Sequence, residues 1–118
     1  MAAALPRELT DLERSVLAQM LDRPGESVAL IAAQLSHAIV SNREHTGVGF
    51  YTNFAIPDDA PILRDLPDHE IGDVGGKHPQ LRFGAGFLLF IRNGVVSFLE
   101  GYTYEDPWPS DESSFTIH

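Results

Sequence analysis

Cysteine is absent from the sequence, which excludes a disulfide framework, a thiolate metal cluster and a cysteine nucleophile. Long apolar runs are lacking too. An apolar run such as residues 87–91 is far too short to span a bilayer, and the first residues have neither a basic leader nor a long apolar stretch. We therefore expect a soluble protein of the cytoplasmic type.

Basic residues are scarce. The sequence has 8 lysines and arginines against 17 aspartates and glutamates, a formal net charge of −9. Residues 57–73 and residues 100–112 each carry a net charge of −5. Such a charge repels phosphate backbones and anionic lipids, so we expect no nucleic-acid partner and no membrane partner. It attracts a basic protein partner, although surplus carboxylates also serve simply to keep a small domain in solution.

The composition is that of one folded domain spanning residues 1–118, with 43% hydrophobic and 21% charged residues. Thr10 and Glu13 have the spacing of a capping box and predict a helix that ends before Pro24. Ser27 is the expected cap of a second helix, which runs to about His37. The short break between them favours an antiparallel helical hairpin over residues 10–37.

Strand patterns follow from residue 39 to residue 104. Alternating apolar residues predict a strand over 47–56, and shorter strands are expected at 39–45 and 71–74, with a turn at 75–79. Residues 81–92 and 95–104 flank Asn93-Gly94, which predicts a β-hairpin with a type I′ turn. We therefore predict an α+β fold, in which the helical hairpin packs on a mostly antiparallel sheet of four or five strands, followed by a tail at 105–118.

The two-residue turn predicts the register of this hairpin. It pairs Arg92 with Val95 and places Glu100 opposite Phe87, on the same face as Leu89. Both faces of the hairpin are then apolar, and two helices cover only one of them. The other face needs cover from the Pro-rich loop, from the tail or from a second copy of the chain, and we expect a homodimer.

Three polar residues are candidates for ligand binding: Arg43, His45 and Glu100. Arg43 and His45 share one face of their predicted strand. Buried alone, Glu100 would have a raised pKa, as a general acid or base requires. Paired with Arg43 or Arg82 it would form a structural ion pair. No catalytic residue is assigned on this basis.

Aromatic residues near the end of the sheet are candidates for protein binding. Tyr102, Tyr104 and Trp108 alternate with small or acidic residues, a pattern typical of protein-binding hot spots. Trp108 has a second possible role, as the anchor that fastens the tail to the sheet.

Motifs for metals and cofactors are lacking. His69, Asp73 and His78 are the best-spaced metal candidates, but their spacing is not diagnostic. Gly47 and Gly49 precede a predicted strand, whereas a phosphate-binding loop precedes a helix. We expect neither a metal nor a cofactor.

Two segments, Arg43-Glu-His-Thr-Gly-Val-Gly-Phe-Tyr-Thr52 and Leu99-Glu-Gly-Tyr-Thr-Tyr104 with Pro107-Trp-Pro109, resemble small bacterial proteins that share an RExTGxGF-like segment and a late LEGY-like strand. This resemblance covers residues from about 39 to 109 and implies no established activity. In size and charge alone, the chain also resembles the acidic immunity proteins of bacterial toxin systems.

Three functional hypotheses remain from the sequence. The leading interpretation is a non-enzymatic protein-binding domain with an acidic, aromatic-bearing surface. The alternative is a small enzyme or ligand-binding domain with a pocket near Glu100, Arg43 and His45. A purely structural dimer is the third.

Overall fold

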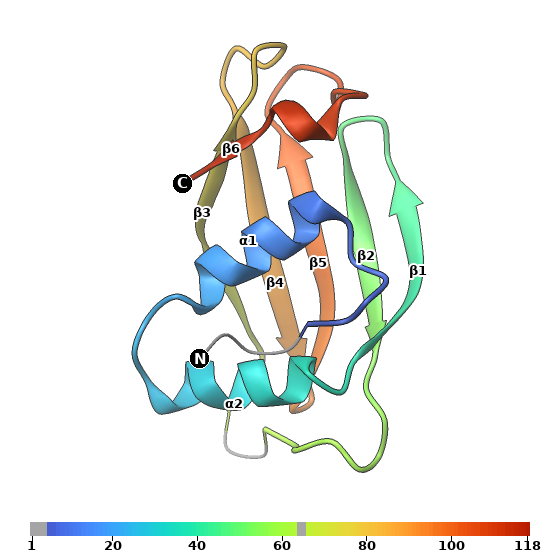
Figure 1. Ribbon diagram of the computed structural model, residues 1–118, viewed down its shortest axis with the longest axis vertical. Coiled ribbons are helices and arrows are strands. Elements are labelled where there is room, and N and C mark those ends of the chain that lie inside the picture. The colour runs from blue at the N-terminus through green and yellow to red at the C-terminus, as the bar shows by residue number, and fades with distance from the viewer. Residues whose placement is uncertain (1–4, 64–65) are drawn as a thin grey trace.

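The computed structural model describes residues 5–63 and 66–118, in which two helices lie over one side of an antiparallel sheet (Figure 1). The elements are α1 (Asp11–Leu21), α2 (Glu26–Leu35), β1 (Ile39–His45), β2 (Gly49–Ala55), β3 (His69–Lys77), β4 (Ala85–Arg92), β5 (Val95–Thr103), the short 3₁₀ helix η1 (Glu112–Ser114) and β6 (Thr116–Ile117). The strands are ordered β1-β2-β5-β4-β3-β6. The predicted α+β class and antiparallel pairing are confirmed, but the sheet has six strands rather than four or five. No helix among the described residues is long and apolar enough to cross a membrane.

The two helices begin in different ways. The capping box of α1 is present: the Glu13 amide donates to the Thr10 hydroxyl at 3.1 Å, and the Thr10 amide donates to the Glu13 carboxylate at 2.7 Å. Ser27 does not cap α2, because the N-cap is Gly25, which makes no side-chain hydrogen bond. Gly25 has a φ of +136°, which glycine adopts without strain. The turn at this residue leads directly into α2.

The hydrophobic core lies between the helices and the sheet face that they cover, which we call the inner face. Alternate residues of β2 are buried there as predicted, namely Phe50, Thr52 and Phe54. Other core side chains less than 2% exposed come from both layers: Val16, Leu17, Met20, Ile31, Leu35, Phe87, Leu89, Ile91, Val96 and Leu99. The opposite side of the sheet, which we call the outer face, carries the alternating side chains.

Strand β3 is longer than predicted. It continues into the expected turn at 75–79 as far as Lys77, because Gly75 and Gly76 pair with Gly86 and Ala85 of β4. On its other side, Gly76 also pairs with Ile117 of β6. Two neighbouring strands therefore hold these glycines in extended backbone.

The β4–β5 hairpin has the predicted turn and a different register. Asn93 and Gly94 have φ values of +54° and +76°, as a type I′ turn requires, and Arg92 pairs with Val95. Beyond the next pair, however, the register shifts, because a bulge around Ser97 adds one residue to β5. Glu100 is therefore opposite Leu88, whereas the regular register predicts Phe87.

The bulge reverses the predicted faces of the second half of β5. Leu99 is fully buried on the inner face, whereas Phe98 and Glu100 are half-buried on the outer face. Gly101 also turns inward, where a Cβ would lie only 2.4 Å from the Phe50 ring. The bulge thus places Leu99 and Gly101 against the core. It also keeps the Glu100 carboxylate out of the core, where its burial would cost free energy.

The tail packs on the inner side of the sheet. The Trp108 ring lies 5.3 Å from Phe50 and 5.1 Å from Phe115, measured between ring centroids, and β6 pairs with β3. The Pro-rich loop also lies on the helical side, where Leu63 is buried and Pro61 accepts a hydrogen bond from Gln34 of α2. Neither segment, as far as its residues are described, covers the outer face.

Replacing Gly94 with alanine is expected to destabilise the fold by about 1–2 kcal/mol, the usual cost of a left-handed backbone for a residue with a side chain. A Cβ at this position would also lie 3.2 Å from the Leu63 carbonyl oxygen. Urea denaturation followed by circular dichroism measures the change. Asn93→Gly is the control, because glycine adopts the φ of +54° without strain. Equal stability of Gly94→Ala and the wild type would contradict the turn.

Candidate protein-binding face

The outer face is built from cross-strand rows of side chains. Two rows cross the middle of the sheet, from β1 or β2 to β4 or β3: Glu44, Tyr51, Glu100 and Leu88 form one, and Asn53, Phe98, Phe90 and Glu70 form the other. A third row contains Tyr102, Gly86 and Gly75. Together with the pair Arg92 and Val95 beside the turn, these three rows make up the outer face.

Aromatic rings form the centre of this face. Phe90 and Phe98 are stacked, with ring centroids 4.4 Å apart and an interplanar angle of 24°. Tyr51 meets Phe98 edge-on at 5.6 Å. All three rings are half-buried by their neighbours within the sheet, although no helix or tail segment in the described parts of the chain covers them. The three rings thus form one connected aromatic cluster.

Glu100 lies in the middle of these groups. Tyr51 and Leu88 are its cross-strand neighbours, and Phe98 and Tyr102 flank it along β5 on the same face. The negative charge of Glu100 raises the pKa of the Tyr51 phenol. The pKa of Tyr102 is also raised, chiefly by burial and then by the neighbouring Tyr104 hydroxyl.

The three predicted ligand-binding residues do not converge. Arg43 turns to the inner side, where its Nη2 and Nε lie 2.6 and 2.9 Å from the carboxylate oxygens of Glu13. Glu100 is on the outer face, and His45 is exposed at the end of β1. The pocket predicted near these residues is therefore not formed.

Neither arginine proposed as a partner for Glu100 contacts it. Arg43 pairs with Glu13, and Arg82 pairs with Asp106 at 3.1 Å and Glu105 at 3.6 Å. In the described residues, Glu100 forms no ion pair. The predicted structural ion pair of Glu100 is wrong, because the bulge in β5 turns its side chain away from the helical side.

Glu13 is a buried charged residue that the sequence indicated only as part of a helix cap. It is 2% exposed, and its carboxylate accepts hydrogen bonds from Thr10, Arg43 and the Thr52 hydroxyl. Burial acts to raise the pKa of Glu13, but these hydrogen bonds, led by those from Arg43, hold it below its usual value. Its position three residues before Val16 indicated this burial, because that spacing puts both on one helix face.

The three aromatic candidates separate into two groups. Tyr102 and Tyr104 meet edge-on at 5.6 Å toward the outer side, and Tyr104 is 59% exposed. Trp108 packs on the inner side, where its indole N–H donates to Glu112 at 2.9 Å. Trp108 is thus the tail anchor, the second role that the sequence suggested.

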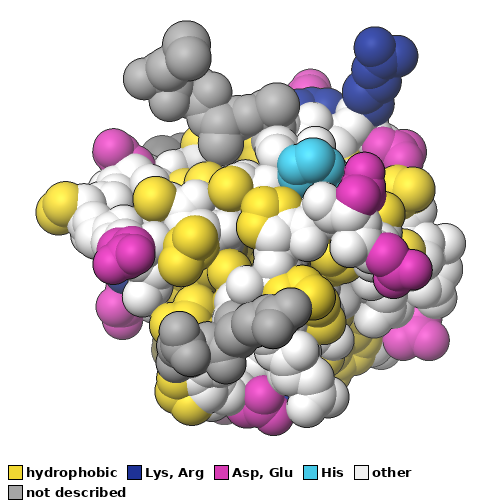
Figure 2. All heavy atoms as spheres, turned by 90° about the horizontal axis from the view of Figure 1, so that it is seen from below, with side chains coloured by type: hydrophobic (Ala, Val, Ile, Leu, Met, Phe, Trp, Pro, Cys, Tyr) yellow, Lys and Arg dark blue, Asp and Glu magenta, His cyan; other side chains and the backbone are white. Residues whose placement is uncertain are grey.

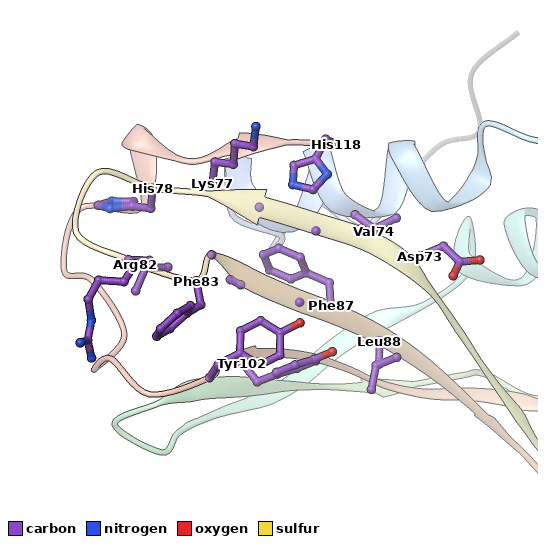
Figure 3. Close-up of a pocket in the computed structure, with 17 residues that line it drawn as sticks. Asp73, Val74, Lys77, His78, Arg82, Phe83, Phe87, Leu88, Tyr102 and His118 are labelled. Carbon is purple, nitrogen blue, oxygen red and sulfur yellow. The ribbon is translucent and has the colours of Figure 1, made fainter.

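A hollow of about 740 Å³ adjoins the third row, at the end of the sheet where β3 meets β4 (Figure 3). Gly75 and Gly86 are at its floor, and the rings of His118 and Tyr102 lie over them, because a Cβ on either glycine would meet these rings. Lys77 and Phe83 also line it. Sequence reasoning missed this hollow, because the rings and the glycines come from four separate strands or segments.

Comparison of the chain with protein-family models, with curated proteins and with solved structures found no match in any of the three. Its function is therefore inferred from this geometry.

The metal candidates lie apart on the sheet. His69 is at the start of β3, where its Nδ1 lies 2.8 Å from the Pro67 carbonyl oxygen. His78 follows the other end of β3 and is buried, with its Nε2 2.7 Å from the Asp111 carbonyl oxygen. Within residues 5–63 and 66–118, no group of three or more histidines, aspartates or glutamates could hold a metal ion.

Acidic side chains are spread widely over the surface. Figure 2 shows one end of the molecule, where acidic side chains surround hydrophobic surface and basic ones gather at one edge. Asp58, Asp59 and Asp68 are exposed in the Pro-rich segment that follows β2. The outer face adds Glu44, Glu70 and Glu100, so any partner that approaches it meets a negative potential.

Proposed function

We propose that this chain is a non-enzymatic protein-binding domain whose outer face binds a basic protein partner. The proposal rests on one observation: every described element that covers the sheet lies on its inner side. Both helices and the tail pack on the inner side, and they leave Tyr51, Leu88, Phe90 and Phe98 without described cover. Contiguous apolar surface of this kind marks binding sites in folded domains.

The charges of the outer face support a basic partner. Three glutamates lie among its aromatic groups, at positions 44, 70 and 100. Its arginine, Arg92, is held over the Phe90 ring, with the guanidinium carbon 5.0 Å from the ring centroid. Complementary charge speeds the encounter of two proteins and selects between partners.

The edges of the sheet are less suitable for binding than its face. A bulge interrupts the edge strand β1 between Val40 and Asn42. Another interrupts β3 between Ile71 and Val74, in the part of β3 that does not pair with β6. Asp73, within the second bulge, has a φ of +66°. Bulges at exposed edges hinder the addition of a further strand, so the face is the better candidate surface.

A second copy of the chain is the other possible occupant, as the homodimer hypothesis requires. Two copies stacked through this face would bring like-charged glutamates together, and each copy has a net charge of −9. We therefore favour the basic partner. Size-exclusion chromatography with light scattering separates the two: a dimer that Leu88→Asp dissociates would assign the outer face to self-association.

One form of the proposed function is that this domain inhibits its basic partner by binding to it. The chain resembles immunity proteins in size and charge, and those proteins block the active site of a toxin. The alternative of a small enzyme or ligand-binding domain has lost the pocket near Arg43, and the hollow beside Tyr102 is one location where a ligand could bind instead.

The function is tested by affinity capture from a lysate of the source cell with wild-type protein and two matched variants. Leu88→Asp places a charge at the centre of the outer face, and Leu30→Asp makes the same change on the exposed side of α2, where Leu30 is 38% exposed. We expect a basic protein that binds wild type and Leu30→Asp, is lost with Leu88→Asp, and is released as salt is raised. Equal capture by both variants would contradict the outer face as the binding surface.

A further inference from the structure

We propose that Glu100 and the aromatic rings around it form a recognition site for an arginine side chain of the partner. This inference rests on the proposed function and names the group that the outer face recognises. Two observations support it. The Glu100 carboxylate lies among apolar and aromatic neighbours, and no cation in the described residues forms an ion pair with it.

The neighbours of Glu100 surround it on four sides. Tyr51 and Leu88 lie across the strands on either side, and Phe98 and Tyr102 lie two residues away along β5. The Tyr51 and Phe98 rings meet edge-on at an angle of 73°, so together they present both a ring edge and a ring face. A cation that binds the carboxylate therefore also contacts aromatic surface.

The charge of Glu100 is not neutralised within the described residues. Arg43 and Arg82 are committed to other carboxylates, and Arg92 donates to the carbonyl oxygens of His69 and Ile91. Glu100 is half-buried, so its charge is only partly hydrated. An incoming cation gains from this charge more than it gains from a fully exposed carboxylate.

The molecule already shows how a guanidinium packs on this face. Arg92 extends over Phe90, 5.0 Å from the ring centroid, in the row next to Glu100. A planar guanidinium stacks on an aromatic ring and also donates two parallel hydrogen bonds to a carboxylate, which an ammonium group cannot do in the same geometry. The combination of one carboxylate and flanking rings thus favours arginine over lysine.

The test uses a small probe, N-acetyl-arginine methylamide, titrated into the full chain and followed by NMR. We expect saturable shifts of the Leu88 methyl signals and of the Tyr51 and Tyr102 ring signals. Glu100→Gln should weaken binding about tenfold or more, because it removes the charge-assisted hydrogen bonds. Glu26→Gln removes one exposed charge from the first turn of α2, on the helical side of the sheet, and should leave binding within about twofold, since screening of a distant surface charge is efficient.

Two further probes decide the chemistry. The citrulline analogue has the same shape without the charge, and the lysine analogue has the charge without the planar group, so both should bind more weakly than the arginine probe. Equal binding of the lysine probe, equal loss in Glu100→Gln and Glu26→Gln, or an absence of saturable shifts would each overturn the proposal.

The outcome is distinguishable from that of the proposed function. A partner that is captured by wild type and lost with Leu88→Asp, but retained fully by Glu100→Gln, would uphold the binding face and overturn the arginine site. Saturable binding of the arginine probe without any captured protein would uphold the site and count against the protein-binding function.

Discussion

Replacing Gln34 with leucine is expected to lower the free energy of unfolding by about 3 kcal/mol, because the buried Val96 amide loses its acceptor and the Pro61 and Gly94 carbonyl oxygens each lose a donor. Gln34 is fully buried on α2, and its amide donates to the carbonyl oxygens of Pro61 at 2.8 Å and Gly94 at 3.0 Å. Its carbonyl oxygen accepts from the Val96 amide at 2.6 Å. One side chain therefore joins the helix to the Pro-rich loop and to the β4–β5 hairpin.

Urea denaturation measures this loss, and two variants control for it. Gln19→Leu makes the same change at an exposed position of α1 and should have little effect. Gln34→Glu keeps the acceptor for Val96 but faces two carbonyl oxygens with a carboxylate, so its stability should rise as the pH falls. Faster hydrogen exchange of the Val96 amide in Gln34→Leu is the local readout. If Gln34→Leu were as stable as Gln19→Leu, the proposed role of Gln34 would be wrong.

Replacing Arg43 with methionine is expected to destabilise the protein by about 3 kcal/mol at neutral pH. The reason is that Glu13, which is 2% exposed, would keep its charge and lose its cation. Arg82→Met is the matched control, because the Arg82 side chain is 66% exposed and its ion pairs lie on the surface. That variant should change stability much less, as surface ion pairs contribute little.

The pH dependence of the Arg43→Met effect follows from the lowered pKa of Glu13. A carboxylate whose pKa is lower in the folded state stabilises the fold above its unfolded pKa, and this contribution is lost as the pH falls through the folded value. The difference between wild type and Arg43→Met should therefore be largest at neutral pH and shrink in acid. Denaturation curves at several pH values check this, and a difference that is independent of pH would contradict the ion pair.

Local patterns predicted the elements that depend on neighbouring residues. The capping box at Thr10 and the Asn93-Gly94 turn were both found as expected, because each is determined by a few adjacent groups. The bulge at Ser97 was missed, since a turn sets the register only of the pairs beside it. A signal was nevertheless present, because the regular register would bury Glu100. The desolvation of a carboxylate costs more free energy than the loss of one pairing between the strands.

The candidate site was predictable only in part. The sequence indicated Glu100, Tyr102 and Tyr104, all of which lie on the outer side, but it grouped Glu100 with Arg43 on the wrong face. Cross-strand neighbours such as Tyr51 depend on strand order, and β2 pairs with β5 although residues 56–94 lie between them. Such long-range pairings have no local signature.

All the covering elements in the described residues lie on one side of the sheet. Folding and surface recognition therefore depend on different side chains of the same strands. Side chains that point inward, such as Leu89 and Leu99, form the core that maintains the fold. Their neighbours Leu88 and Phe98 point outward and are not part of that core. Under the proposed function, substitutions at the second set change what the surface recognises and leave the core intact. One scaffold of this design can diversify to serve a series of partners without being rebuilt.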